Sequence, residues 1–196
     1  MKKLIALVFA FFTLVYAEAQ TSRLGLKAGI NYAGFVGDDA EDKGYESQVG
    51  LLGGLVVNIG ISDRVGIKPE ILYSAKGSQI DVDNQRDEDD KYNLKYIDVP
   101  ILINVNAGNL FFEIGPQVGY LLSAKFNDTD IKDNYNKIDF GYAAGLGYML
   151  DNGINIGLRY NGGLSEIYND DAPIANKPGY RNSAFQLTLG YMWPGK

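Results

Sequence analysis

The sequence contains neither cysteine nor histidine in its 196 residues. The lack of cysteine excludes a disulfide framework, and the lack of both residues removes the usual protein ligands of transition metals. Histidine is also the commonest general base of hydrolytic enzymes, in which it activates the nucleophile. These absences argue against a metalloenzyme and a histidine-dependent hydrolase, and we expect no cofactor.

Long apolar segments are also missing, apart from one at the N-terminus. Residues 4–16 are apolar, follow Lys2 and Lys3, and precede Ala17-Glu18-Ala19. A positive start, a short apolar run and a small-x-small site are typical of a cleaved secretory signal, whereas a spanning helix needs about 20 apolar residues. We therefore expect residues 1–19 to be a signal peptide and residues 20–196 to form one domain. The acidic balance, a formal net charge of −6, disfavours nucleic acid as a partner.

What the sequence does contain is typical of strands. It has 24 glycines, 14 tyrosines and 9 phenylalanines, and aromatic residues favour strands. No window has a 3.6-residue apolar period, but a period of two recurs in eight segments. We place these strands at about 23–35, 47–59, 63–76, 92–105, 110–125, 138–150, 153–165 and 181–193.

The spacers between these segments alternate between short and long. The short ones, 60–63, 106–109 and 150–153, pair glycine with asparagine, aspartate or serine, as tight hairpins require. The long ones are 36–46, 77–91, 126–137 and 166–180. Short turns on one side and long loops on the other are typical of outer-membrane barrels, whose short turns are periplasmic. The sequence thus predicts an all-β, eight-stranded, antiparallel up-and-down transmembrane β-barrel in the bacterial outer membrane, with both termini periplasmic.

Each predicted strand has one apolar face and one face of glycine, alanine, polar and charged residues. In 153–165, for example, Ile156 and Leu158 oppose Asn155 and Arg159. A soluble lipocalin-like barrel would also alternate, with the apolar face inside. However, every strand has such a face, aromatic residues gather near strand ends, and the chain has no helix or second sheet to cover it. Lipid is therefore the expected cover, and the polar face is expected to line the lumen.

Several charged residues fall on the lumenal face at similar heights, if each residue adds about 3.3 Å along its strand. The expected cluster is Lys27, Lys68, Glu70, Asp98, Glu113 and Arg159, with Asp139 nearer the outer rim. An eight-stranded barrel has an interior just wide enough for side chains to fill, and charges removed from water must be paired. We therefore expect an ion-paired, plugged interior, and we prefer this interpretation to a catalytic carboxylate pair.

Prolines and acidic loops raise two further questions. Pro100 and Pro116 each remove a backbone donor from a ladder that has no edge, so we expect local bulges or displaced bonds there. Most acidic residues lie in the long loops, where charge keeps exposed chain solvated. Asp81-x-Asp83 and Asp128-x-Asp130 are similar to the start of a calcium loop, but the glycine and closing glutamate are absent. We therefore predict no metal site.

Five segments of the sequence resemble the outer-membrane "porin family" β-barrel domain common in Bacteroidetes, sometimes called PorT-like. They are GLKAGINYAGF, VGIKPEILYSAKG, YIDVPILINVN, FFEIGPQVGYLL and FGYAAGLGYML. The resemblance implies a small transmembrane barrel and assigns no activity. The end, TLGYMWPGK, is similar to the assembly signal of such barrels, with Gly190, Tyr191 and Trp193 in the signal positions and three residues after the aromatic. This implies contact with the barrel-assembly machinery.

The sequence leaves several functions open. The first is a non-enzymatic barrel in outer-membrane lipid, with a structural role or as an accessory subunit of a larger outer-membrane complex. The second is a narrow pore for ions or small solutes. The third is a surface adhesion or ligand-binding module that acts through the acidic loops. A soluble lipocalin-like binder is the remaining alternative for the fold.

Overall fold

The structure is a computed structural model of the chain, and it describes residues 22–37, 40, 44–80, 90–169, 172 and 179–194. The expected signal peptide, the calcium-like Asp81-x-Asp83 and parts of three long loops lie outside these residues. No helix in the described part of the chain is long and apolar enough to cross a membrane.

Eight long strands make up almost all of the described chain, together with one short strand and one turn of 3₁₀-helix. They are β1 (Ser22–Val36), β2 (Tyr45–Gly60), β3 (Val65–Ile80), β4 (Asp90–Ala107), β5 (Leu110–Phe126), β6 (Thr129–Asp130), η1 (Lys132–Asn134), β7 (Ile138–Met149), β8 (Ile154–Gly163) and β9 (Arg181–Met192). The eight long strands coincide with the eight predicted segments to within a few residues at each end.

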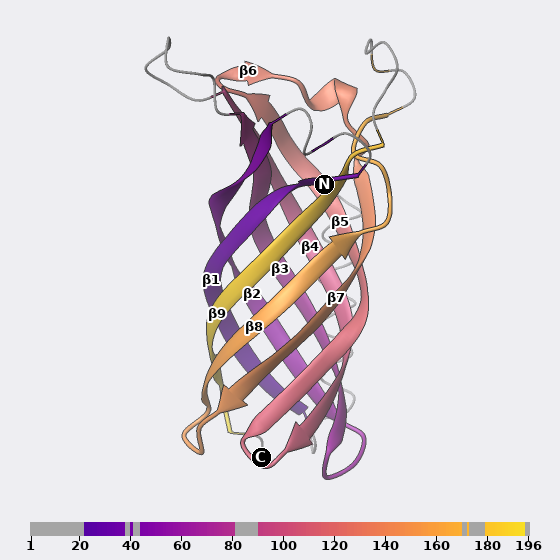
Figure 1. Cartoon of the computed structure of the whole chain (residues 1–196). Helices are drawn as coiled ribbons and strands as arrows, with labels where there is room; N and C mark the ends of the chain where they lie inside the picture. The colour runs from indigo at the N-terminus through magenta and orange to yellow at the C-terminus, as the bar shows by residue number, and fades with distance from the viewer. Residues whose placement is uncertain are drawn as a thin grey trace.

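The long strands form one closed antiparallel barrel (Figure 1). Each pairs with its neighbours in the chain, and the ring closes where β1 pairs with β9, from Gly25 opposite Met192 to Val36 opposite Arg181. The predicted eight-stranded up-and-down barrel is confirmed. The tight turns gather at one end, which we call the short-turn end, and the long connections gather at the other, the long-loop end.

The short strand β6 was not predicted. It folds back on the end of β5, where Lys125 pairs with Asp130 and Phe126 with Thr129. Asn127 makes this possible by adopting a positive φ of 52°, a conformation that asparagine tolerates better than most residues. The polar sequence of this loop has no alternation over two residues, so its strand could not be read from periodicity.

The two faces of the barrel wall differ sharply. On β9, Leu187 is 49% exposed on the outside, whereas Gln186 beside it is 0% exposed on the inside. The same alternation holds on the other strands, so most large exposed side chains of the wall are apolar and most lumenal ones are polar or small. This arrangement is the reverse of a soluble barrel and excludes the lipocalin-like alternative.

Of the bulges or displaced bonds expected at the prolines, the structure shows interrupted strand pairing without a change of register. The β4–β5 register is the same at Pro100, opposite Gln117, and at Ile103, opposite Ile114. The β4–β5 pairing is interrupted between these points, at Pro116, and the β3–β4 pairing is interrupted at Pro100, because a proline has no N–H to donate. The irregularities of register lie elsewhere, between Ser47 and Leu52 on β2 and at Lys95–Tyr96 on β4. The barrel thus accommodates the prolines by omitting bonds.

Candidate functional site

The most conspicuous feature of the lumen is a buried network of ion pairs, made of Lys27, Lys68, Glu70, Glu113 and Arg159. Lys27 Nζ lies 2.7 Å from Glu70 Oε1, and Lys68 Nζ lies 2.8 Å from Glu113 Oε2. Arg159 donates to both carboxylates: its Nη1 lies 2.7 Å from Glu70 Oε2 and its Nε lies 2.7 Å from Glu113 Oε1. All five side chains are at most 5% exposed, so water does not screen these pairs.

The four strands that supply this network are evenly spaced around the barrel. In ring order they are β1, β3, β5 and β8, with one strand between each successive pair. Arg159 on β8 and Glu70 on β3 therefore come from opposite walls, and their bidentate contact crosses the lumen. A planar guanidinium fits carboxylates in this forked geometry better than an ammonium does. The network consequently spans the lumen from wall to wall at the level of these residues.

Five of the six residues predicted to cluster are thus brought together, and Asp98 is not one of them. Asp98 is in register with Leu72 on β3, and its Oδ2 lies 2.8 Å from Lys76 Nζ. Lys76 shares the inward face of β3 with Lys68 and Glu70, so its lumenal position was visible in the sequence. The sequence did not reveal that the long side chain of Lys76 extends to Asp98. Asp98 therefore has a buried partner of its own, outside the network.

Polar side chains continue the filling of the lumen beyond the network. Asn31 Nδ2 donates to Ser74 Oγ at 3.0 Å, and Gln186 Nε2 donates to Asn31 Oδ1 at 2.8 Å. Further toward the long-loop end, Asn182 Nδ2 donates to Asp139 Oδ2 at 2.9 Å and contacts the Tyr96 hydroxyl at 3.2 Å.

An aromatic cluster closes the long-loop end. Its members are Phe35, Tyr45, Tyr92, Tyr135, Tyr168 and Tyr180. The Phe35 ring stacks on Tyr180 with centroids 6.2 Å apart, and Tyr135 meets Tyr168 at 5.0 Å. Burial raises the pKa of the Tyr135 hydroxyl, which lies in the loop after η1, so this side chain stays neutral. Sequence analysis missed the cluster because Tyr135 and Tyr168 come from long loops that it read only as solvated chain.

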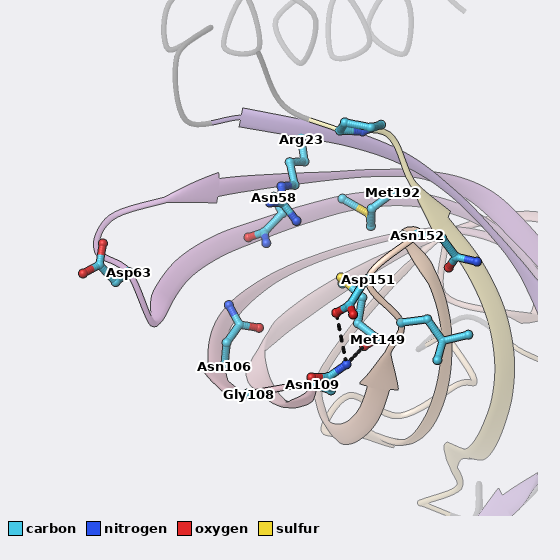
Figure 2. Close-up of a pocket in the computed structure, with 13 residues that line it drawn as sticks. Arg23, Asn58, Asp63, Asn106, Gly108, Asn109, Met149, Asp151, Asn152 and Met192 are labelled. Atoms are coloured by element: carbon cyan, nitrogen blue, oxygen red, sulfur yellow. Dashed lines mark hydrogen bonds between the residues drawn. The ribbon is translucent and has the colours of Figure 1, made fainter.

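Cavities occur inside the barrel and at its short-turn end. A cavity of about 10 Å³ lies near Gln117 and Asn161, between the network and the aromatic cluster. A larger cavity of about 410 Å³ opens at the short-turn end (Figure 2). Its lining is polar, with Arg23 and Asn58 on one side and Asn109 and Asp151 on the turns facing them.

The expected assembly signal lies at the short-turn end of β9. Gly190 is in register with Lys27 of β1 and Asn155 of β8. Tyr191 and Trp193 face outward and meet edge to face, with centroids 5.6 Å apart. This position is the level of an interfacial aromatic girdle.

No group of three or more potential metal-ligating side chains occurs within the described ranges. Asp128 and Asp130, from the second calcium-like motif, are exposed, and Asp130 accepts a hydrogen bond from the Lys132 backbone N–H. That contact is typical of a turn.

Comparison with known proteins agrees with this architecture. The family model described as "Outer membrane protein beta-barrel domain" matches residues 18–169. Neisserial surface protein A is similar in structure, with a TM-score of 0.56, 12% identity, and coverage of 87% of this chain and 97% of that one. The Ail attachment invasion locus protein of Yersinia pestis, solved with the heparin analogue sucrose octasulfate, gives a TM-score of 0.50, 13% identity, and coverage of 88% and 99%. At such identities these structures show a shared fold alone. No curated protein matches the sequence.

Proposed function

This chain belongs to the outer membrane protein β-barrel domain family, and we propose that it acts as a sealed, non-enzymatic barrel. In this role the barrel wall lies in outer-membrane lipid and carries the long loops at one end. The protein then serves as a structural element or as an accessory subunit of a larger outer-membrane complex. The short turns and both chain termini would then face the periplasm, as in other barrels of this membrane.

The observation that carries the proposal is the network across the lumen. Glu70 and Glu113 each use both carboxylate oxygens in contacts with Arg159 or a lysine. A conducting pore keeps its charged groups hydrated, whereas these groups are buried and paired with one another. The same saturation argues against catalysis, because a general acid or base needs an oxygen free to exchange a proton with substrate.

Conductance measurements in planar lipid bilayers test the sealed lumen. The wild-type barrel is expected to give no stable conductance steps. The double variant Glu70→Ala/Arg159→Ala removes a cross-lumen ion pair without changing the net charge of the protein. We expect this variant to conduct. Arg64→Ala, a change at an exposed turn residue, is the matched control and should stay silent. Heat-modifiable migration on a gel would establish that each variant is folded.

Stable, solute-size-dependent steps from the wild type would overturn the proposal and favour a narrow pore. The polar lumen is the feature that would support that alternative, but its buried pairing weighs against it.

The accessory role is tested by gentle detergent extraction from native membranes, followed by sizing and mass spectrometry. A stoichiometric partner would support the accessory subunit and identify the complex. A single species of the barrel's own mass would leave the structural role and remove the accessory one.

We also propose that the chain is PorT-like, because five of its segments resemble that family. We further propose that the barrel-assembly machinery recognises Gly190, Tyr191 and Trp193, because these residues lie at the end of the last strand, β9.

A surface-binding role through the loops is the remaining candidate. The similar Ail structure holds a sulfated heparin analogue, but the long-loop segments of this chain are acidic by sequence. Like charges repel a polyanion, so a ligand of these loops would be cationic or neutral. Loop deletions that preserve the barrel but abolish binding to cells would favour this role.

A further inference from the structure

We propose that the cavity at the short-turn end binds a small zwitterion of the short-peptide class, with its carboxylate on Arg23 and its ammonium on Asp151. This goes beyond the sealed-barrel function, because a closed lumen is compatible with an empty or an occupied mouth. The cavity has a volume of about 410 Å³, within the range of small-molecule pockets, about 300–1,000 Å³.

Its lining is rich in amides that come from several strands and turns. Asn58 lies at the end of β2, Asn106 at the end of β4, Asn109 in the β4–β5 turn and Asn152 in the β7–β8 turn (Figure 2). An amide side chain both donates and accepts hydrogen bonds, so this ring suits a ligand that contains peptide groups.

The charges of the lining define the two ends of the ligand. The structure gives Arg23 no ion pair within the described ranges, although two carboxylates, Asp63 and Asp151, line the same cavity. Arg23 lies on β1, and Asp151 lies on the β7–β8 turn, where Asn109 Nδ2 holds it at 3.5 Å. A guanidinium and a carboxylate that face one cavity without meeting are complementary to a molecule with both charges.

Titration calorimetry with the dipeptide Ala-Ala tests this assignment on the whole barrel in nanodiscs. Ala-Ala is expected to bind, and its C-amidated and N-acetylated forms are each expected to bind about tenfold more weakly, because each loses one charge-assisted contact. Arg23→Gln should weaken Ala-Ala and abolish the penalty for amidation alone. Asp151→Asn should abolish the penalty for acetylation alone.

Arg64→Gln is the matched control, because it removes a positive charge at the same end of the barrel outside the cavity lining. It should leave all three affinities unchanged. The proposal is overturned if Ala-Ala fails to bind, if the capped peptides bind as well as Ala-Ala, or if Arg64→Gln has the effect of Arg23→Gln. None of these results bears on conductance, so the sealed-barrel proposal would stand or fall separately.

Discussion

Removing Glu70 should destabilise the barrel more than removing Arg159, although both residues belong to the same network. The network holds three positive and two negative side chains. Arg159→Ala leaves two of each, with Lys27 still on Glu70 and Lys68 still on Glu113. Glu70→Ala leaves three positive charges around one carboxylate and removes the partner of Lys27, whose Nζ lies 2.7 Å from Glu70 Oε1.

Breaking a buried pair by removing one partner costs about 3–5 kcal/mol. We expect Arg159→Ala near the lower end of this range, because Glu70 and Glu113 lose hydrogen bonds but keep an ammonium each. We expect Glu70→Ala at or above the upper end, because an ammonium remains buried without its counter-ion. Lys27→Met added to Glu70→Ala should recover part of the loss, because it removes that ammonium.

Urea unfolding in lipid vesicles measures these differences, followed by the fluorescence of Trp193, the single tryptophan. Arg64→Ala, at an exposed turn position, provides the baseline for removing an arginine. An unfolding free energy of Arg159→Ala equal to that of wild type would refute the reasoning. So would a Glu70→Ala variant more stable than Arg159→Ala, since the charge count could then not be the deciding effect.

Three further changes test other parts of the barrel by the same unfolding assay. Tyr96→Phe should cost about 1 kcal/mol, because it removes the hydroxyl that Asn182 contacts at 3.2 Å; an unchanged stability would mean that this contact contributes nothing. Leu187→Arg on the outer face should cost about 2–4 kcal/mol if the residue lies near the bilayer midplane, and a neutral result would argue that lipid does not cover this face. Gly77→Ala should destabilise the barrel, because Gly77 has a φ of +132° and an added Cβ would collide with the Tyr92 carbonyl oxygen; a folded variant of wild-type stability would contradict that geometry.

The lumen has three layers of different chemistry. The ion-pair network lies toward the short-turn end, polar side chains such as Asn31 and Gln186 lie beyond it, and the aromatic cluster closes the long-loop end. The three layers come from strands far apart in the chain: Arg159 and Glu70 are 89 positions apart, and Gln186 and Asn31 are 155 apart. Each such contact forms only when the barrel has closed, so the lumen is expected to order late in folding, after local hairpins.

The sequence by itself determined the strands, their faces and the lengths of their connections. These properties are local, because side chains alternate along any strand and turn residues act where they stand. Asn155 and Arg159 therefore read as lumenal, and Ile156 and Leu158 as outward, before any contact was known. The number of strands and the gathering of the short turns at one end of the barrel followed from the same pattern.

The tertiary structure decided which lumenal groups meet. Height along a strand predicted Asp98 beside Glu70 and Glu113. The β3–β4 register instead places Asp98 opposite Leu72, where its carboxylate pairs with Lys76. Likewise, alternation said nothing about Tyr135 and Tyr168, because loops have no period and their side chains reach the lumen only by folding back. Pairing across a closed barrel depends on register, strand tilt and side-chain length together, and these become fixed only when the first strand joins the last.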